Sequence, residues 1–209
     1  PPPPARFQWP DWSVPTGRTV LTCHQPRVSD RLTASVSLSI DTGDRILLTG
    51  PNGAGKSTLL AVLVGELEPD SGRVNRHPNA RVALLGQEVP DWDPHRTAVE
   101  IYRDHVDQLG LTSAPGLART GLLGSDTAGT AVSRLSQGQQ RRLHLALCLA
   151  EEPDLLILDE PTNHLSFALV DALTAALNTA SCAVVVATHD RQLLRDLSDW
   201  PTLALPGQR

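Results

Sequence analysis

Methionine is absent from the 209-residue sequence, and aromatic residues make up only 3% of it. The chain opens with PPPPARFQWPDWSVP, with no methionine at position 1. This opening indicates a piece of a longer chain; removal of a start methionine before a disordered tail is the alternative. The opening also holds Phe7, Trp9 and Trp12. Three large aromatic side chains favour a segment that packs on a domain over a free linker.

Cysteine pairs, long apolar runs and an excess of positive charge are missing too. Cys23, Cys148 and Cys182 lie far apart and form no CxxC pair, which favours reduced thiols in a cytoplasmic protein. No apolar run approaches the ~20 residues that span a bilayer, so we expect no direct membrane insertion. The net charge of -5 gives no sign of a basic surface that would bind nucleic acid. A local basic patch is indicated only by the neighbouring Arg141 and Arg142.

Apolar runs and helical stripes alternate along the chain. At 40% hydrophobic residues, the chain has enough apolar material for one globular domain, or one domain with a small lobe. The expected strands span 18–23, 36–40, 45–50, 81–87, 155–160 and 182–190. The expected helices run from 56 to about 69 and over 95–109, 115–123, 141–150, 167–180 and 191–197, with a loop over 124–133. This order predicts an α/β layered fold with a mainly parallel sheet.

A glycine-rich loop stands between an apolar strand and a helix. Residues 50–57 read GPNGAGKS and fit G-x-x-x-x-G-K-[ST] in the required strand–loop–helix context. Glycines let such a loop curl its N–H groups toward phosphate oxygens, and the helix N-terminus adds favourable partial charge. Lysine then neutralises the β- and γ-phosphates, and the serine hydroxyl ligates Mg²⁺. The predicted nucleotide-binding residues are Asn52, Gly53, Ala54, Gly55, Lys56, Ser57 and Thr58.

A second apolar strand, LLILDE, ends in the adjacent carboxylates Asp159 and Glu160. A charge near a core is costly unless it is paired, so a cation or a reacting group is expected beyond the strand. Beside a phosphate loop, we expect Asp159 to approach the same Mg²⁺ through water. Glu160, one residue on, is placed to polarise a water for in-line attack on the γ-phosphate.

Three further stretches point to one family. LSQGQ (135–139) precedes the basic helix, Gln87 ends the strand after the phosphate-loop helix, and His189 ends the last strand in ATHDR. In order and spacing, the region from about 18 to 209 resembles the nucleotide-binding domain of ABC ATPases. The resemblance implies a P-loop NTPase fold with an antiparallel β part and a small helical lobe over about 92–140, and it implies ATP and Mg²⁺ as cofactors.

The same resemblance implies roles for residues outside the phosphate loop. Gln87 would sense Mg²⁺ and the attacking water, and His189 would hydrogen-bond the γ-phosphate. Ser136, Gly138 and Gln139 would bind the γ-phosphate of an ATP held by a facing ATPase domain. That domain would lie in the same full-length chain or in a second copy of this one. The isolated domain is therefore expected to hydrolyse ATP weakly.

The stretch Asn163-His164-Leu165 after DEPT is similar to the ABC-F family of soluble twin ATPases that act on ribosomes, and the phosphate-loop region resembles its antibiotic-resistance members. The interval from Gln87 to Leu135 is too short for a long inserted arm, which is typical of the second ATPase domain. Residues 1–17 would then be the end of an interdomain linker or a packed extension, and the ribosome would be contacted through the linker before residue 1. Nothing in the sequence indicates which antibiotic is involved, if any.

Three positions depart from the family pattern. The signature has Gln137 where glycine is common, but its serine and its helix-starting glycine remain, so we expect the signature to keep its function. Ser166 stands where the family has aspartate, and we expect this change to alter communication across the dimer. The aromatic residue that stacks on adenine is missing near Arg27 and Val28. The guanidinium of Arg27, or else Trp9 or Trp12 folding back, would fill that role.

Two other functions fit parts of the pattern. The ATPase subunit of an ABC membrane transporter, acting in drug export, would use the same phosphate chemistry, but Asn163-His164 argues against it. A non-hydrolysing nucleotide-binding module would share the fold, but retention of Lys56, Glu160 and His189 argues against that.

Overall fold

The computed structural model describes residues 7, 9–111 and 114–207 of the chain, which divide into two compact units. The helical unit comprises the described residues of Pro1–Trp12, Gln87–Glu152 and Thr162–Thr179. The sheet unit comprises those of Ser13–Gly86, Pro153–Pro161 and Ala180–Arg209. Of the predicted linker segment 1–17, residues 1–6 and 8 lie outside the described residues.

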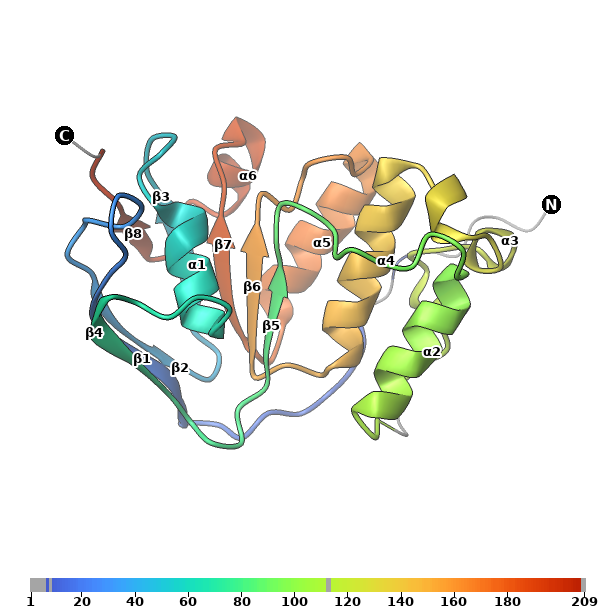
Figure 1. The fold of residues 1–209 in the computed structure, drawn as a ribbon, viewed down its shortest axis with the longest axis horizontal. Coiled ribbons are helices and arrows are strands. Elements are labelled where there is room, and N and C mark those ends of the chain that lie inside the picture. Colours follow the sequence, from blue (N-terminus) through green and yellow to red (C-terminus); the bar gives the residue numbers. More distant parts are fainter. Residues whose placement is uncertain (1–6, 8, 112–113, 208–209) are drawn as a thin grey trace. The chain divides into compact units, whose positions relative to one another are not determined.

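A five-stranded parallel sheet forms the centre of the sheet unit (Figure 1). Its order is β5 (Val82–Leu85), β6 (Leu155–Asp159), β7 (Ala183–Ala187), β3 (Arg45–Thr49) and β8 (Thr202–Ala204). Every residue of β6 and β7 is buried, which explains why both strands read as continuous apolar runs. The predicted α/β fold with a mainly parallel sheet is confirmed.

A separate three-stranded antiparallel sheet has the order β2 (Ser37–Asp41), β1 (Thr19–Arg27) and β4 (Ser71–Arg76). The pairing of β1 with β4 shifts register between His24 and Arg27, where Gln25 has a positive φ of 42°. Strands β4 and β8 were not predicted from the sequence. β4 reads SGRVNR and has one apolar residue, and β8 is three residues long, so neither carries a periodic signal.

Helix α1 (Lys56–Val64) packs against both sheets of this unit, in contact with β1, β5 and β6. Its buried leucines join a core built from the two sheets, which includes Val20, Leu21, Cys23, Ile40, Leu48, Ile157 and Val185. Carbonyl groups in the last turn of α1 accept hydrogen bonds from the antiparallel sheet. Arg76 donates from Nε to the Leu63 carbonyl at 2.7 Å and from Nη2 to the Val62 carbonyl at 3.2 Å. Helix α6 (Arg191–Asp196) follows β7.

The buried carboxylate of Asp154 joins several strands just before β6. It accepts a hydrogen bond from Arg18 and another from the backbone N–H of Arg81, at 2.8 Å. Its own carbonyl accepts from the N–H of Ala183, at 2.9 Å. Asp154 is therefore hydrogen-bonded to residues at or just before the starts of β1, β5 and β7. These bonds fix the positions at which β5 and β7 begin beside β6.

The helical unit contains α2 (Ala98–Gln108), α3 (Ser125–Ala128), α4 (Gln137–Ala150) and α5 (Phe167–Thr179), with 3₁₀ turns over Leu117–Thr120 and Val132–Arg134. Thr97 and Glu100 form a capping box at the start of α2, which lies beside α4. The predicted helix over 115–123 is reduced to the first 3₁₀ turn, and the expected loop over 124–133 contains α3. Helix α4 begins four residues before the expected position, because Ser136 caps it.

The three aromatic residues of the N-terminal stretch, Phe7, Trp9 and Trp12, belong to this unit, and Trp9 contacts both of the others. The rings of Trp9 and Trp12 stack with their centroids 5.6 Å apart, and Trp12 is buried. Within the described residues, no helix has both the length and the apolar character that a bilayer crossing requires.

Replacing Gly72 by alanine tests the close approach of β1 and β4 at the bulge. A Cβ there would lie 2.2 Å from the Gln25 carbonyl oxygen, and Gly72 has a φ of 81°. We expect Gly72→Ala to lower the free energy of unfolding by about 3 kcal/mol or more in urea denaturation. Gly43→Ala is the control, since its φ is 87° but nothing lies within 4 Å of the added Cβ. It should cost only the left-handed strain of about 1 kcal/mol. Equal losses in both variants would show that the bulge is not tightly packed.

Candidate functional site

The glycine-rich loop runs from the end of β3 to the start of α1. Gly55 caps the helix with a left-handed φ of 91°, and a Cβ at this position would lie 2.5 Å from the Arg31 carbonyl oxygen. Ala54 is buried, and its N–H donates to the Pro51 carbonyl at 3.1 Å. The loop is therefore a tight turn that leads into the N-terminus of a helix, which is the geometry that binds phosphate.

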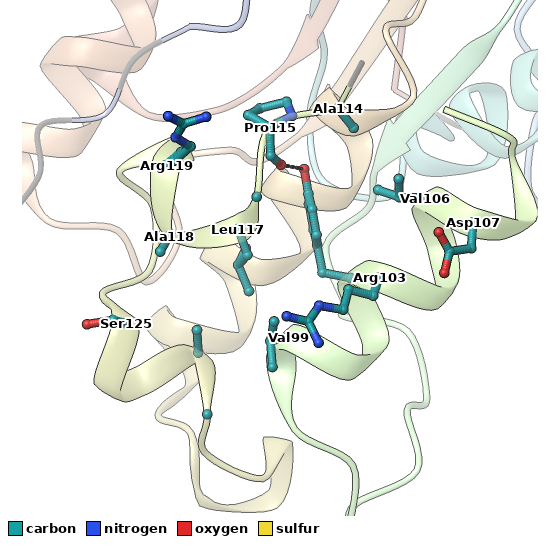
Figure 2. Close-up of a pocket in the computed structure, with 14 residues that line it drawn as sticks. Val99, Arg103, Val106, Asp107, Ala114, Pro115, Leu117, Ala118, Arg119 and Ser125 are labelled. Carbon is teal, nitrogen blue, oxygen red and sulfur yellow. Dashed lines mark hydrogen bonds between the residues drawn. The ribbon is translucent and has the colours of Figure 1, made fainter. Parts of the chain in front are cut away.

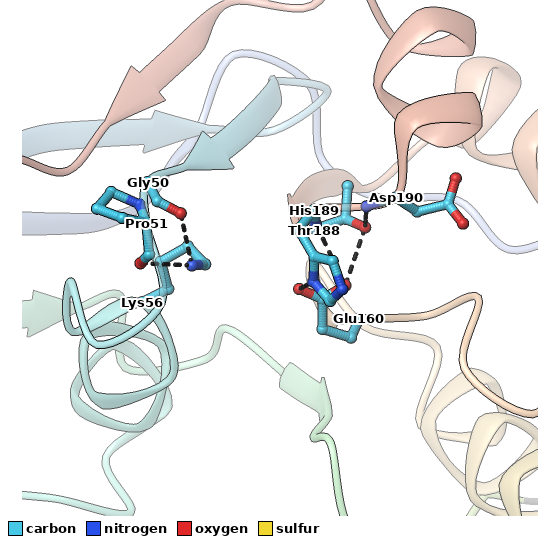
Figure 3. Close-up of polar contacts among 7 residues, drawn as sticks. All are labelled: Gly50, Pro51, Lys56, Glu160, Thr188, His189 and Asp190. Atoms are coloured by element: carbon cyan, nitrogen blue, oxygen red, sulfur yellow. Dashed lines mark hydrogen bonds and ion pairs between the residues drawn. The ribbon is translucent and has the colours of Figure 1, made fainter. Parts of the chain in front are cut away.

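The ammonium group of Lys56 lies over this loop (Figure 3). The side chain is 9% exposed, and Nζ donates to the carbonyl oxygens of Gly50 at 2.8 Å and Pro51 at 3.1 Å. Backbone carbonyls share the positive charge there, and no carboxylate is bonded to it among the described contacts. A phosphate oxygen can replace these carbonyls as a stronger, charged acceptor.

The carboxyl ends of β6 and β7 bring Glu160 and His189 together (Figure 3). Glu160 is 4% exposed, and its N–H donates to the Ala187 carbonyl at 2.8 Å. Its Oε1 lies 2.6 Å from His189 Nδ1, and its Oε2 accepts from the His189 N–H at 3.3 Å. When Nδ1 carries the proton that it shares with Glu160, Nε2 is an acceptor. The His189 side chain is 69% exposed, so an incoming group has access to it.

Thr188 is a participant that sequence reasoning did not identify. Its hydroxyl donates to Glu160 Oε2 at 3.0 Å and accepts from the Asp190 N–H at 3.0 Å. Asp190 in turn caps α6 by accepting from the N–H groups of Gln192 and Leu193. The hydroxyl in the stretch ATHD was the available signal, but only the parallel pairing of β6 with β7 shows which carboxylate it faces.

The donor set of the sheet unit suits Mg²⁺ only when phosphates complete the coordination. In the part of the chain that the structure describes, no cluster of three or more His, Cys, Asp or Glu residues is able to hold a metal ion. Asp159 ends β6 as a buried carboxylate, and Ser57 offers a hydroxyl in the first turn of α1. One carboxylate and one hydroxyl are what a phosphate-bound Mg²⁺ takes from a protein, so these residues fit that ion.

The predicted signature residues lie in the helical unit, at the start of α4. Ser136 Oγ accepts from the Gln139 N–H at 3.2 Å, while Gln139 Oε1 accepts from the Ser136 N–H at 2.8 Å. Because this capping box uses Ser136 Oγ as an acceptor, the hydroxyl proton remains available to an outside acceptor. A Cβ on Gly138 would lie 2.5 Å from the His164 carbonyl oxygen, so only glycine fits there.

Gln87 belongs to the same unit as the signature. Its carbonyl oxygen accepts from Arg141 Nη1 at 3.3 Å. Gln87 also lines a polar cavity of about 280 Å³ with Gln137, Gln140 and His164. The structure therefore assembles the predicted site as two groups, one in each unit. Lys56, Ser57, Asp159, Glu160 and His189 lie in the sheet unit, together with Asn52, Gly53, Ala54, Gly55 and Thr58.

The comparisons identify the protein family. Residues 33–163, more than half of the chain, match the family model described as ABC transporter. The chain belongs to this family. It is an ATPase domain, and ATP hydrolysis to ADP and phosphate is the activity of such domains.

Several curated relatives assign the domain to the ABC-F type. The chain is 44% identical over 156 residues to the tylosin resistance ATP-binding protein TlrC of Streptomyces fradiae, covering 75% of this chain and 28% of that protein. It is 37% identical to the ABC transporter ATP-binding protein ARB1 of Saccharomyces cerevisiae, covering 82% and 28%. It is 34% identical to ABC transporter F family member 4 of Arabidopsis thaliana, covering 93% and 29%. The chain thus spans less than a third of the length of these relatives.

Solved structures support the fold. The ATP-binding subunit of an ABC transporter superposes with a TM-score of 0.75 at 22% identity, covering 91% of this chain and 89% of that one. A dimeric ATP-binding cassette in a post-hydrolysis state, bound to ADP and Pi, superposes with a TM-score of 0.70 at 21% identity, covering 90% and 97%. The fold predicted from the sequence, a P-loop NTPase of ABC type, is confirmed.

A second cavity, of about 430 Å³, lies in the helical unit between α2 and the segment around Leu117 (Figure 2). Its lining is mainly apolar, and Tyr102 Oη donates to the Pro115 carbonyl at 2.8 Å. Burial raises the pKa of Tyr102 to about 12, so this hydroxyl stays protonated at neutral pH. The cavity lacks the hydrogen-bonded base and the glycine-rich loop that the phosphate chemistry needs.

Exchanging Glu160 for glutamine separates binding from hydrolysis. The amide oxygen of Glu160→Gln can still accept from Thr188, but the side chain no longer takes a proton from water. We expect ATP hydrolysis by the full-length protein to fall by about 10²–10⁴-fold, with the Kd for ATP within a few-fold of the original. Phosphate release measures the rate of hydrolysis, and calorimetric titration measures the Kd for ATP. The matched control is Glu66→Gln, at an exposed glutamate of the same unit. A Glu160→Gln protein that hydrolyses ATP at the original rate would remove Glu160 from catalysis.

Proposed function

We propose that this chain is the ATP-binding and hydrolysing domain of an ABC-F protein that acts on the ribosome and protects it from an antibiotic. The observation that carries the catalytic part is the hydrogen-bonded group of Glu160, Thr188 and His189 in the same unit as the Lys56 loop (Figure 3). The ribosomal part is supported by the ABC-F relatives and by the resistance named for TlrC.

The lone pairs of Glu160 allow it to act as the general base. A carboxylate has about four acceptor sites. Thr188 Oγ1 and the His189 N–H take two sites on Oε2, and His189 Nδ1 takes one on Oε1. These three donors hold the carboxylate in a fixed orientation at the strand ends, where we assign it the attacking water. His189 Nε2 is the partner we assign to the γ-phosphate.

The remaining residues bind and neutralise the triphosphate. The loop N–H groups of Asn52 to Gly55 and the ammonium of Lys56 surround the β- and γ-phosphates, and Lys56 exchanges its carbonyl partners for phosphate oxygens. Ser57 and Asp159 would hold Mg²⁺ from the sheet unit. For Gln87 we keep the role that the family resemblance implies, sensing of Mg²⁺ and of the attacking water. The ion stabilises the negative charge that develops on the phosphate oxygens when it is bound.

The hydroxyl proton of Ser136 is the feature that leads us to propose a partner domain. Its oxygen already accepts a hydrogen bond within α4, so the hydroxyl is pre-oriented to donate to an acceptor outside the capping box. We assign this acceptor, together with Gly138 and Gln139, to the γ-phosphate on a second ATPase domain, of the same full-length chain or of a second copy. Two ATP molecules are then enclosed between the domains, and hydrolysis releases the pair.

The proposed location is the cytoplasm, where ribosomes work. The three cysteines are consistent with it, because Cys23, Cys148 and Cys182 are all free and buried. Burial raises the pKa of Cys23 and of Cys182 to about 11, so both thiols stay protonated and unreactive near neutral pH.

Ribosome binding is testable with a hydrolysis-blocked form. With Glu160→Gln and ATP, we expect the full-length protein to stay in its closed state and to pellet with ribosomes through a sucrose cushion. The control combines Glu160→Gln with Lys56→Ala, which removes the phosphate-binding ammonium and should leave the protein in the supernatant. If the blocked protein remains in the supernatant with ATP and instead binds detergent-solubilised membrane proteins, the ribosomal assignment is wrong and the transporter alternative stands.

A further inference from the structure

The outer face of the antiparallel sheet carries polar side chains only. Residues that pair across strands share a face, and the pairs Thr22–Ser39, Thr22–Asn75, His24–Ser37 and His24–Arg73 all lie on the face opposite Leu21 and Cys23, which enter the core. We call Thr22, His24, Ser37, Ser39, Arg73 and Asn75 the outer face. All of them except the half-buried Thr22 are exposed.

The outer face continues into a hollow of about 500 Å³ at the β-bulge. His24, Ser37 and Arg73 line it from the outer face, and Gln25, Arg27, Ser71 and Gly72 complete it. The hollow exists because the bulge displaces one strand at Gln25, whose carbonyl lies against Gly72. Bulges are found where a strand redirects side chains toward a ligand.

The hollow contains no carboxylate, although the chain has 23 acidic residues and 18 basic ones. The one carboxylate that alternates with Ser37 and Ser39 on β2 is Asp41, which pairs with Thr19 at the end of the strand away from the hollow. The six residues of the outer face and the residues of the hollow carry two guanidinium groups, one imidazole, four hydroxyls and two amides. Among the described contacts, Arg73 and His24 have no hydrogen-bonding or ionic side-chain partner, and Arg27 reaches only the Thr33 carbonyl, at 3.4 Å. The neighbouring Asp70 is engaged elsewhere: Ser29 donates to it from N at 2.6 Å and from Oγ at 2.7 Å, which lowers the pKa of this carboxyl.

We propose that this surface binds the sugar–phosphate backbone of RNA. Arginine, serine, threonine and asparagine are the side chains that contact phosphate and ribose, and the hollow is large enough for a phosphate group. The outer face has neither the aromatic side chains that are common anchors in protein interfaces nor the apolar side chains that insert into a lipid surface. The choice of RNA over DNA rests on the proposed action at the ribosome.

Arg73 is the residue that tests this surface. It lines the hollow, and it takes no part in the hydrogen bonds of Glu160, Thr188 and His189. The probe is a fluorescent 30-nucleotide RNA hairpin, titrated with full-length protein at 50, 100 and 200 mM KCl. We expect Arg73→Gln to weaken binding about three- to tenfold at 100 mM and to reduce the slope of log Kd against log salt by about 1. Arg73→Lys should keep most of the slope, because it keeps the charge.

Two further variants complete the comparison. Ser37→Asp places a carboxylate beside His24 and should weaken RNA binding at least as much as Arg73→Gln. Arg195→Gln removes an exposed arginine of α6 in the same unit and should leave the Kd unchanged. Unchanged thermal unfolding and ATP binding show that each variant is folded.

Several results would overturn the proposal. These are no RNA binding by the unmodified protein at 50 mM KCl, equal binding by Arg73→Gln, or equal affinity for a DNA hairpin or for poly-glutamate. Ribosome pelleting of the Glu160→Gln protein is independent of these titrations. If it pellets while Arg73→Gln binds RNA normally, the ribosomal function stands and this surface is not its RNA contact.

Discussion

The parallel pairing of β3, β7 and β6 is the constraint on which the site depends. Parallel strands end at the same edge of a sheet, so the loop after β3, the carboxylates after β6 and the histidine after β7 leave the sheet together. Asp154 fixes where β6 and its neighbours begin, and each of these strands is five residues long. Moving one strand by a residue would separate Glu160 from Thr188 and His189, and the base would lose the donors that hold it.

Glu160 shows how the chain compensates for a charge at the edge of a core. The carboxylate is almost completely buried, and a φ of 49° places it beyond the end of β6. Such a conformation is uncommon for a residue with a side chain and costs about 1–3 kcal/mol. Three donors from the residues that follow β7 offset the desolvation of the carboxylate. The strained backbone occurs at the residue to which we assign proton transfer, and the Thr188 hydroxyl helps to hold its carboxylate.

Much of this arrangement could be predicted from the sequence, because its signals are local. The glycine-rich loop, the apolar run before Asp159 and the stretch ATHD are contiguous motifs with a fixed relation to strand ends. Strands β4 and β8 were missed because β4 has a single apolar residue and β8 is three residues long, so neither carries a periodic signal. The role of Thr188 depends on strand order, which no local pattern encodes. The roles that we assign to all the site residues toward ATP remain predictions. For Gln87 and Ser136 the sequence motifs are the whole basis, since both lie in the helical unit and the phosphate loop lies in the sheet unit.

The central claim is that a magnesium-bound triphosphate occupies the loop where Lys56 now contacts two backbone carbonyls. A crystal structure of the full-length Glu160→Gln protein with ATP and Mg²⁺ tests it most directly. The account predicts that Lys56 Nζ leaves the Gly50 and Pro51 carbonyls for the β- and γ-phosphates, with Asp159 facing the metal and Ser136 of a second ATPase domain on the γ-phosphate. A structure in which nucleotide is bound elsewhere while Lys56 keeps both carbonyl contacts would contradict it.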